Sequence, residues 1–540
     1  MAKKLLAALL CAVMTVSVFS GCASNANANA SSSAASSAAE GSESGTGEAA
    51  ASDGTITVAS STLGSTLDPV DCTDGASSMF IYAAYDRLVK YATKEVDGVT
   101  YADVENFDPS IAKDWTVSED QKTWTFYLDE NAKFANGDPV TSEDVKFSFE
   151  RCSSRPQGEF VFSLTNIESI DTPDDYTVVF NLHTHCPIFL QLIEVYSFAI
   201  CNKEEVEAQP EGWLNDHTAG SGPYVIEKYD VATEVSMTAR DDYWNGRAAN
   251  DRMVVKLVKE ISNRQVLLEK GDVDIAFDLP EKELDALDAE EGIRIQTDPS
   301  NKILYLAMNC QMEPFDDPLV RQAICYAIPY DSLIEDVMFN RATRLKSCIP
   351  SIMPGHIENE NTYYEQDLDK AKELLAQAGY PDGFTFDFTL GTGFQDWEDA
   401  AVLIQAELAK IGVTMNIEKM ERAQFLEVAG QGKLAAFINR FMSFVNDPGY
   451  LTGLLLHTDG HFNYNLFDNA QVNELYQNTV DTIDTEERLE IFSDVQEVVK
   501  EEAPWAYLYE YNFSLGLRDN IQDYVYHPDM TLRFDTLKKA

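Results

Sequence analysis

Two histidines near residue 184 form the most metal-like cluster in the sequence. His183 and His185 lie two residues apart, and Cys186 follows them. On a strand this spacing puts both imidazoles on one face, where they could bind zinc or nickel. The alternative is a strand end that leads into the apolar segment 188–193. We favour this alternative, so the sequence predicts neither a set of metal ligands nor a cofactor.

The residue patterns of common enzymes are missing from the sequence. It contains no GxSxG, HExxH, GxxxxGK[ST] or EF-hand spacing. Gly391-Thr392-Gly393 could approach a phosphate, but such a pair of glycines is more often a tight turn. Because the chain has 90 acidic residues, carboxylate pairs are common and none indicates a glycosidase. We expect no catalytic residues, with an exported glycoside hydrolase as a distant alternative.

The acidic composition limits the partners of the protein. The chain of 540 residues has 40 Lys and Arg against 90 Asp and Glu, a net charge of −50. Such a charge repels nucleic acids and anionic bilayers. The hydrophobic content of 45% is sufficient for two or three domains with full cores. We therefore predict a globular protein that does not bind nucleic acid.

The first 53 residues are predicted to direct and tether the protein. Two lysines precede an apolar stretch at 5–19, which is shorter than the roughly 18 residues that indicate a membrane span. Small residues then lead to Cys22 in a pattern that resembles a bacterial lipobox, although Phe19 stands where Leu is usual. An ordinary cleaved signal with an incidental cysteine is the alternative. We predict a signal peptide at 1–21, lipidation at Cys22 and a flexible Ser/Ala-rich linker at 22–53.

The remaining cysteines do not suggest a disulfide framework. Once the signal peptide is removed and Cys22 is lipidated, the odd set that remains is Cys72, Cys152, Cys186, Cys201, Cys310, Cys325 and Cys348. No CxxC spacing occurs among them. We expect these cysteines to be buried thiols.

Strand and helix patterns alternate through the rest of the chain. Residues 55–59 and 124–128 are predicted strands, and Thr141 with Asp144 indicates a capping box before a helix. Phenylalanines alternate over 384–388 as a strand, which is followed by a helical repeat and a second strand at 413–417. This βαβ unit should have a right-handed crossover, and the loop 391–397 should lie at the carboxyl edge of the sheet, where ligands bind.

A series of short motifs gives the chain a family resemblance. They are Leu67-Asp68-Pro69, Tyr85-Asp86-Arg87-Leu88-Val89, Lys133-Phe134-Ala135-Asn136-Gly137-Asp138-Pro139, Ser221-Gly222-Pro223-Tyr224, Tyr243-Trp244-Asn245-Gly246, Lys270-Gly271-Asp272-Val273-Asp274 and Val320-Arg321-Gln322-Ala323. In this order they resemble the large solute-binding proteins of peptide-type ABC importers, the oligopeptide- and dipeptide-binding protein family. The resemblance extends over about 55–534.

The resemblance implies an α/β, two-lobe periplasmic-binding-protein-like fold with a hinge, of the large type with an extra subdomain in the first lobe. The first lobe would be 54–304, with the extra subdomain at about 85–220. The second lobe would be 305–509, and 510–540 would return to the first lobe. The hinges would fall near Ile303 to Asn309 and near Tyr507 to Asn512. Ligand would favour the closed arrangement by a population shift.

The implied partners are a peptide or other small solute and ABC permease subunits with cytoplasmic ATPases. We expect a monomer held by its lipid at the cell surface, on the outer face of the cytoplasmic membrane. In Gram-negative cells that is the periplasmic side. The implied function is capture of a peptide or peptide-like solute and its delivery to the permease. A non-peptide solute such as a sugar or metal chelate, or a role as a surface sensor, is the alternative.

The charged groups that hold peptide termini in the family are missing at the matching positions. Alignment on Asp447-Pro448 places Phe444 where relatives have an aspartate for the peptide ammonium group, and Phe441 where a Trp is frequent. Gly391 falls where dipeptide binders have an arginine for the carboxylate. A short free peptide therefore fits less well than a long or capped peptide or a non-peptide ligand.

The predicted ligand-binding residues are Phe394, Trp397, Phe441, Phe444, Asn446, Asp447, Asn309 and Tyr305. For Phe441 and Phe444 a place in the core is the alternative. Trp397 opens a helix beside the loop 391–397, so we expect it to face the ligand. For Asp447, a turn-forming role beside Pro448 is favoured over a ligand charge.

Overall fold

A computed structural model describes residues 54–96 and 98–540, which belong to one compact unit. The predicted signal peptide, the lipidation site at Cys22 and most of the predicted linker lie outside the described residues.

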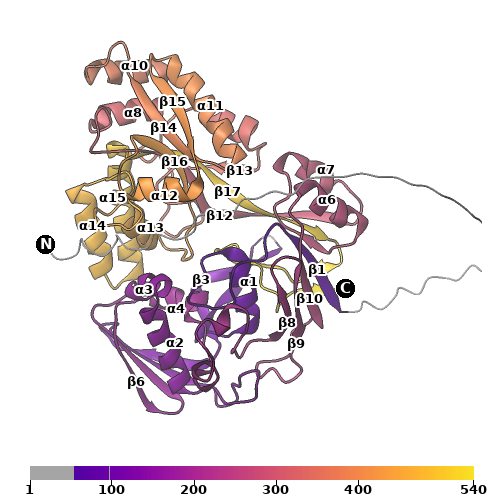
Figure 1. Ribbon diagram of the computed structural model, residues 1–540. Coiled ribbons are helices and arrows are strands. Elements are labelled where there is room, and N and C mark those ends of the chain that lie inside the picture. Colours follow the sequence, from indigo (N-terminus) through magenta and orange to yellow (C-terminus); the bar gives the residue numbers. More distant parts are fainter. Residues whose placement is uncertain (1–53, 97) are drawn as a thin grey trace, which may run out of the picture. The chain divides into compact units, whose positions relative to one another are not determined.

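One long sheet is the frame of this unit (Figure 1). Its strand order is β15-β14-β16-β12-β17-β11-β1-β10-β9-β8. We call the half that contains β1 the first lobe and the half that contains β14 the second lobe. The long strands β12 (Ile293–Met308) and β17 (Trp505–Arg518) pair antiparallel and run through both halves. Their register shifts between Pro299 and Ile303, so the ladder is interrupted where one lobe passes into the other.

The second lobe contains the predicted βαβ unit. Strands β14 (Thr385–Gly391) and β15 (Thr414–Met420) are parallel and are joined by helix α11 (Gln395–Ala409), which confirms the prediction. Strand β16 (Ala436–Phe441) lies between β14 and β12. Helices α8 (Pro318–Ala327), α10 (Leu368–Gln377) and α11 supply apolar side chains to one core with these strands (Figure 1).

The first lobe is built around β1 (Thr55–Ser60), which pairs in parallel with β10 (Arg252–Leu257) and β11 (Ile275–Ala276). Strands β9 (Glu234–Ala239) and β8 (Tyr224–Asp230) extend the sheet on this side. Residues near the carboxyl terminus, including Leu515 and Phe534, share a core with Ile56. The two ends of the described chain are therefore packed together.

A separate four-stranded antiparallel sheet belongs to the first lobe. Its order is β4 (Ala112–Val117), β5, β7 (Thr177–Leu182) and β6 (Ile167–Asp174). Strand β5 (Thr123–Leu128) buries Trp124, Phe126 and Leu128 and turns Tyr127 outward, as the alternating pattern predicts. Helix α2 (Ser142–Ser154) lies against this sheet. Its predicted capping box is present, because the Thr141 backbone N–H donates to the Asp144 carboxylate at 2.9 Å.

Further strands are β2 (Val89–Val96), β3 (Val99–Pro109), β13 (Ala342–Arg344), β18 (Ile521–Gln522), β19 (Val525–Tyr526) and β20 (Lys538–Lys539). Further helices are α1 (Gly75–Ala84), α3 (Pro156–Ser163), α4 (Phe189–Glu194), α5 (Lys203–Glu207), α6 (Ile261–Lys270), α7 (Leu284–Asp288), α9 (Tyr330–Ser332), α12 (Arg422–Gly430), α13 (Pro448–Leu455), α14 (Ala470–Asp481) and α15 (Thr485–Glu502).

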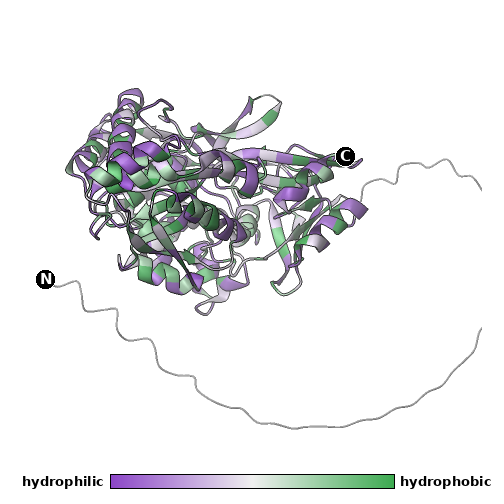
Figure 2. Cartoon of the chain, turned by 90° about the horizontal axis from the view of Figure 1, so that it is seen from above, coloured by the Kyte–Doolittle hydropathy of each residue, from purple (hydrophilic) through white to green (hydrophobic). Residues whose placement is uncertain are grey.

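The helices carry both polar and apolar side chains. Figure 2 shows hydrophilic and hydrophobic residues interleaved along them. Within 54–96 and 98–540, no helix is long and apolar enough to cross a membrane. The seven cysteines of these ranges are free thiols, and all except Cys310 are buried. Burial raises the pKa of the Cys72 thiol to about 12, which makes it a poor nucleophile at neutral pH.

Candidate functional site

A cavity of about 510 Å³ lies between the two lobes. This volume is in the range of roughly 300–1,000 Å³ that is typical of small-molecule sites. The first lobe contributes Cys72, Thr73, Phe160, Val161, Tyr196 and Ser197, among others. The second lobe contributes Tyr305, Arg422, Asn439, Phe441, Phe444 and Phe462, among others. A solute in this cavity would contact both lobes at once.

Aromatic rings form much of the cavity wall. Tyr196 of the first lobe meets Phe444 of the second edge-to-face, with ring centroids 6.0 Å apart. Phe441 lies 6.0 Å from Phe462 between ring centroids. Tyr305 is buried and packs against Trp505 at 4.5 Å. Such rings bury a large apolar area and stack on planar groups, so the wall suits an apolar or aromatic ligand.

The polar groups of the cavity are cationic or neutral. Arg422, Arg440 and His461 line it, whereas none of the described residues that line it is Asp or Glu. Both terminal nitrogens of Arg422 donate to the Asn439 side-chain oxygen at 3.2 Å. Burial and the neighbouring Arg440 lower the pKa of Arg422. The cavity is therefore a positive region in a protein of net charge −50.

The side chain of Arg422 fills the space that Gly391 leaves open. A Cβ added to Gly391 would lie 3.1 Å from the Arg422 Cδ and 3.5 Å from its Nη1. Gly391 is the position where the family resemblance implies an arginine for the ligand carboxylate. An arginine from helix α12 lies beside this position, so a cation is nearby although residue 391 is Gly.

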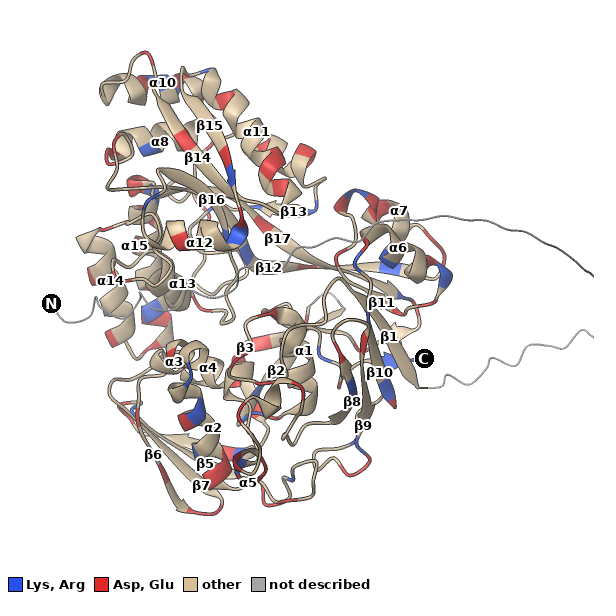
Figure 3. Ribbon diagram, viewed as in Figure 1, with Lys and Arg blue, Asp and Glu red and all other residues tan. Residues whose placement is uncertain are grey.

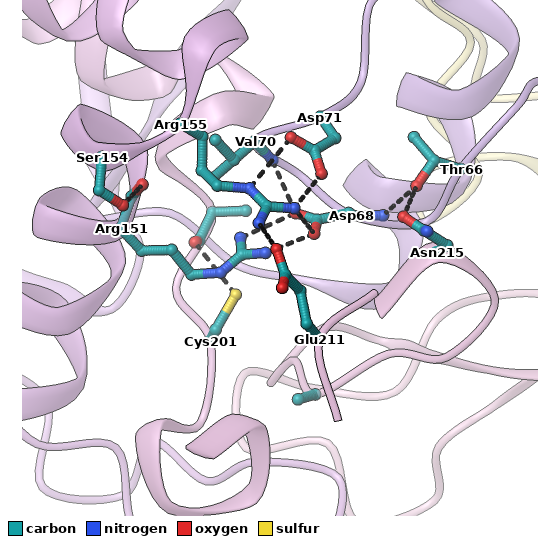
Figure 4. A network of polar contacts seen from close by, with 12 residues as sticks. Thr66, Asp68, Val70, Asp71, Arg151, Ser154, Arg155, Cys201, Glu211 and Asn215 are labelled. Atoms are coloured by element: carbon teal, nitrogen blue, oxygen red, sulfur yellow. Dashed lines mark hydrogen bonds and ion pairs between the residues drawn. The ribbon is translucent and has the colours of Figure 1, made fainter. Parts of the chain in front are cut away.

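A network of ion pairs fixes the first-lobe wall (Figure 4). Arg151 donates to the buried carboxylate of Asp68 at 2.8 Å, and Arg155 donates to Asp71 through its Nε at 3.2 Å. These arginines belong to the end of α2 and the residue after it, and the acids precede Cys72 in the chain. The network thus joins two segments that both supply cavity residues, those around Cys72 and those from 156 to 161.

Four predicted ligand-binding residues lie at or beside the cavity. Tyr305, Phe441 and Phe444 line it. Phe394 does not line it but lies 4.5 Å from the Arg440 guanidinium carbon, measured to its ring centroid. A contact between any of these residues and a ligand stays a prediction.

The other four predicted ligand-binding residues form hydrogen bonds with groups of the protein itself. Trp397 is fully buried, where its indole N–H donates to the Tyr511 hydroxyl at 3.1 Å, so the expectation that it faces the ligand is not met in this conformation. The Asn309 amide donates to the backbone oxygens of Gly432 and Leu434 at 3.0 and 3.1 Å.

Asn446 and Asp447 are also held within the second lobe. The Asn446 amide donates to the Ile352 carbonyl at 3.1 Å. Asp447 caps helix α13 through the Gly449 N–H at 2.7 Å and accepts two bonds from Arg488 at 2.6 and 2.8 Å. Asp447 therefore caps a helix beside Pro448 and pairs with a buried arginine, and a contact of its carboxylate with a ligand stays a prediction.

The two histidines of the candidate metal cluster have separate partners. His183 is exposed and lies 3.6 Å from Glu168, whereas His185 is within 3.3 Å of the Thr482 backbone oxygen. Among the described residues, no group of three or more His, Cys, Asp or Glu side chains is arranged to hold a metal ion.

Two lobes that share a sheet and enclose a cavity are the architecture of the class of solute-binding proteins. Residues 106–463 match the model of the bacterial extracellular solute-binding proteins, family 5 (middle part), and the chain belongs to that family. This confirms the family resemblance and the two-lobe α/β fold.

Curated relatives and solved structures agree with the assignment. The chain is 30% identical to the probable D,D-dipeptide-binding periplasmic protein DdpA of Escherichia coli, over 88% of this chain and 92% of that protein. It is 28% identical to heme-binding protein A of Haemophilus influenzae, over 78% and 80% of the two chains. DppA of Helicobacter pylori in complex with the peptide STSA has a TM-score of 0.76 at 25% identity, covering 90% of this chain and 98% of that one. HbpA2 of Haemophilus parasuis shares the fold, with a TM-score of 0.79 at 24% identity and coverage of 90% and 100%.

Proposed function

We propose that this protein is the lipid-anchored solute-binding component of an ABC importer, which captures a peptide or peptide-like solute between its lobes and delivers it to a membrane permease. The observation that carries the proposal is the cavity with walls from both lobes. Membership of the solute-binding family and the peptide-binding relatives support it. The protein would bind its solute without turnover and act as a monomer.

Closure would be a rotation about the two long strands β12 and β17. The register shift at 299–303 provides a place where the ladder can bend, since three residues there lack regular partners. Glu510 on β17 is buried beside this place and accepts hydrogen bonds from the Ser351 N–H and hydroxyl. A solute that contacts both Tyr196 and Phe444 would favour the closed arrangement, because the open one loses one of the two contacts.

Native mass spectrometry of residues 54–540 tests the proposal. This part has its own cores and forms the described compact unit, so it is suitable for expression alone. The protein would be purified without denaturant from cells grown in rich medium. A series of bound peptide masses supports the peptide function. A protein that stays empty, and that also fails to bind any member of a peptide library, contradicts it.

The anchor and the delivery step need separate tests. Replacing Cys22 by Ala should release the protein from the membrane fraction into the medium or periplasm and abolish incorporation of labelled fatty acid. Uptake of the bound solute by cells should then fall, although the purified variant binds it as before. Retention of the Cys22→Ala protein at the membrane would contradict the lipid anchor.

A second candidate is import of a non-peptide solute by the same fold. The cavity has no acidic group among its described lining residues to receive a peptide ammonium, and its wall is largely aromatic. One curated relative is named as a heme-binding protein. A single non-peptide mass in the same native mass spectrometry experiment would favour this candidate.

A further inference from the structure

The two cavity arginines lack the acidic partners that arginines in this protein usually have. Arg87, Arg151, Arg155, Arg344, Arg488 and Arg533 each form an ion pair with Asp or Glu. For Arg422 the described partner is instead the neutral Asn439 amide oxygen. Arg440 lies over the Phe394 ring. With 90 acidic residues in the chain, the absence of an acid among the described residues that line this cavity is a distinguishing property of the site.

The two guanidinium groups lie around the same aromatic ring. The Arg440 and Arg422 guanidinium carbons are 4.5 and 5.7 Å from the Phe394 ring centroid. Arg422 is also 5.1 Å from the centroids of Trp397 and Phe425, so its plane is held by aromatic faces. The charge of Arg440 is one of the causes that lower the pKa of Arg422, so the two cations repel each other and an anion beside them would relieve that repulsion.

The chemistry of this pair favours a carboxylate. A guanidinium has five N–H donors in a planar fork, and Arg422 directs donors from two nitrogens to Asn439, which leaves others available. The described contact of the Arg440 guanidinium is the face of the Phe394 ring, so its N–H groups have no acidic partner among the described residues. Figure 3 shows blue, basic segments beside the start of α12, in a chain whose ribbon is marked red by acidic residues in many places, α12 included.

The other residues that line the cavity indicate the chemistry of the rest of the ligand. Tyr196, Phe444 and Phe462 surround the space with aromatic rings. No acid on the described lining would pair with a ligand ammonium group. A free amino terminus would therefore lose its hydration in the cavity without gaining a counter-ion.

We propose that the cavity selects a solute with a carboxylate on an apolar or aromatic body and with a blocked or absent amino group, and that Arg422 and Arg440 bind the carboxylate. This inference rests on the proposed solute-binding function and names the substrate class of the same site. Asn439 is a positioning residue, because its side-chain oxygen orients the Arg422 guanidinium.

Matched probe libraries test the inference on residues 54–540. The first library is a set of N-acetyl tripeptides with a free carboxylate and aromatic or aliphatic side chains. The second has the same sequences as C-terminal amides, and the third has a free amino group and a free carboxylate. Native mass spectrometry and titration calorimetry measure binding. We expect the N-acetyl acids to bind at least about tenfold more tightly than either other library, since a charge-assisted bidentate bond is lost in the amides.

Arginine variants then assign the residues. Arg422→Gln and Arg440→Gln should each remove most of the preference for the acid over the amide, and Arg440→Lys should retain part of it. Arg247→Gln is the matched control, because Arg247 is exposed in the first lobe and pairs with Asp241 and Asp251. A circular dichroism spectrum and a melting curve show whether each variant is folded.

The possible outcomes separate the inference from the proposed function. If the amides bind as tightly as the acids in the unaltered protein, the inference is overturned and the binding function stands. The same holds if the free-amine library binds best, or if folded Arg→Gln variants keep the full preference. If no library binds, both the inference and the peptide-type function are contradicted.

Discussion

Replacement of Trp397 by Ala should destabilise the second lobe rather than remove a ligand contact. The side chain is fully buried, stacks on Phe394 at 4.3 Å between ring centroids and donates to the Tyr511 hydroxyl. Truncation of a buried Trp to Ala lowers the free energy of unfolding by about 3–5 kcal/mol. The lost hydrogen bond adds at most about 1 kcal/mol, because the Tyr511 hydroxyl keeps its bond to Asp396.

Calorimetry and urea unfolding of residues 54–540 measure this effect. A loss of about 4 kcal/mol in a lobe of this size corresponds to a fall in melting temperature on the order of 10 °C. Trp397→Phe, which keeps an aromatic ring, should lose less than half as much. Val402→Ala is the control on the same helix, because Val402 is 59% exposed and its truncation should change the free energy by less than about 0.5 kcal/mol. If Trp397→Ala melts like the unaltered protein but binds solute weakly, the buried role assigned here is refuted.

Three further perturbations address the cavity, the region of the proposed hinge and a buried ion pair. Phe444→Asp should increase the affinity for peptides with a free amino group by about tenfold, because the new carboxylate can accept a charge-assisted hydrogen bond from that group. Titration calorimetry measures this affinity, with Phe444→Asn as the neutral control. Equal affinities of the two variants would contradict the prediction. Burial raises the pKa of Glu510 to about 7, above its value in the unfolded chain, so its contribution to stability is full below about pH 4.5 and is lost as the pH rises through 7. Glu510→Gln should therefore flatten the fall in unfolding free energy between pH 4.5 and 7 by up to about 3 kcal/mol, and unchanged curves would exclude Glu510 as the titrating group. Arg488→Met should lower the unfolding free energy by about 3–5 kcal/mol, because Asp447 is left buried without its partner. In urea titrations, the double variant Arg488→Met with Asp447→Asn should recover part of the lost unfolding free energy. If the losses of the two single variants simply add, the two groups are not coupled.

The sequence was sufficient for the parts of the fold that depend on local periodicity. The alternation in β5, the capping box of α2 and the parallel β14–α11–β15 unit are all present, because each is encoded by residues a few positions apart. The ordered motifs gave the family, which the family model confirms. The shift in the β12–β17 ladder could not be predicted, since it depends on the pairing of strands separated by about two hundred residues.

The candidate site was predicted only in part, and the reason is geometric. Phe441 and Phe444 were found because they lie near a recognisable Asp-Pro pair. Trp397 follows the loop at the carboxyl edge of the sheet, but its side chain points into the core of the second lobe instead of the cavity. Arg422 was missed because comparison of single positions cannot show that a side chain from another helix fills the space beside Gly391. Its place directly after strand β15, at the carboxyl edge of the sheet, was the available signal.

The described residues that line the cavity include no Asp or Glu although the protein is strongly acidic, and this contrast affects association kinetics. An anionic solute that approaches a body of net charge −50 is slowed by long-range repulsion, and the attraction of Arg422 and Arg440 acts only once it is near the cavity. Added salt shortens the Debye length to about 10 Å at 0.1 M, which weakens the distant repulsion more than the contact inside the cavity. The association rate of such a solute would therefore rise with ionic strength, the reverse of the usual behaviour of oppositely charged partners, while its dissociation rate would change little.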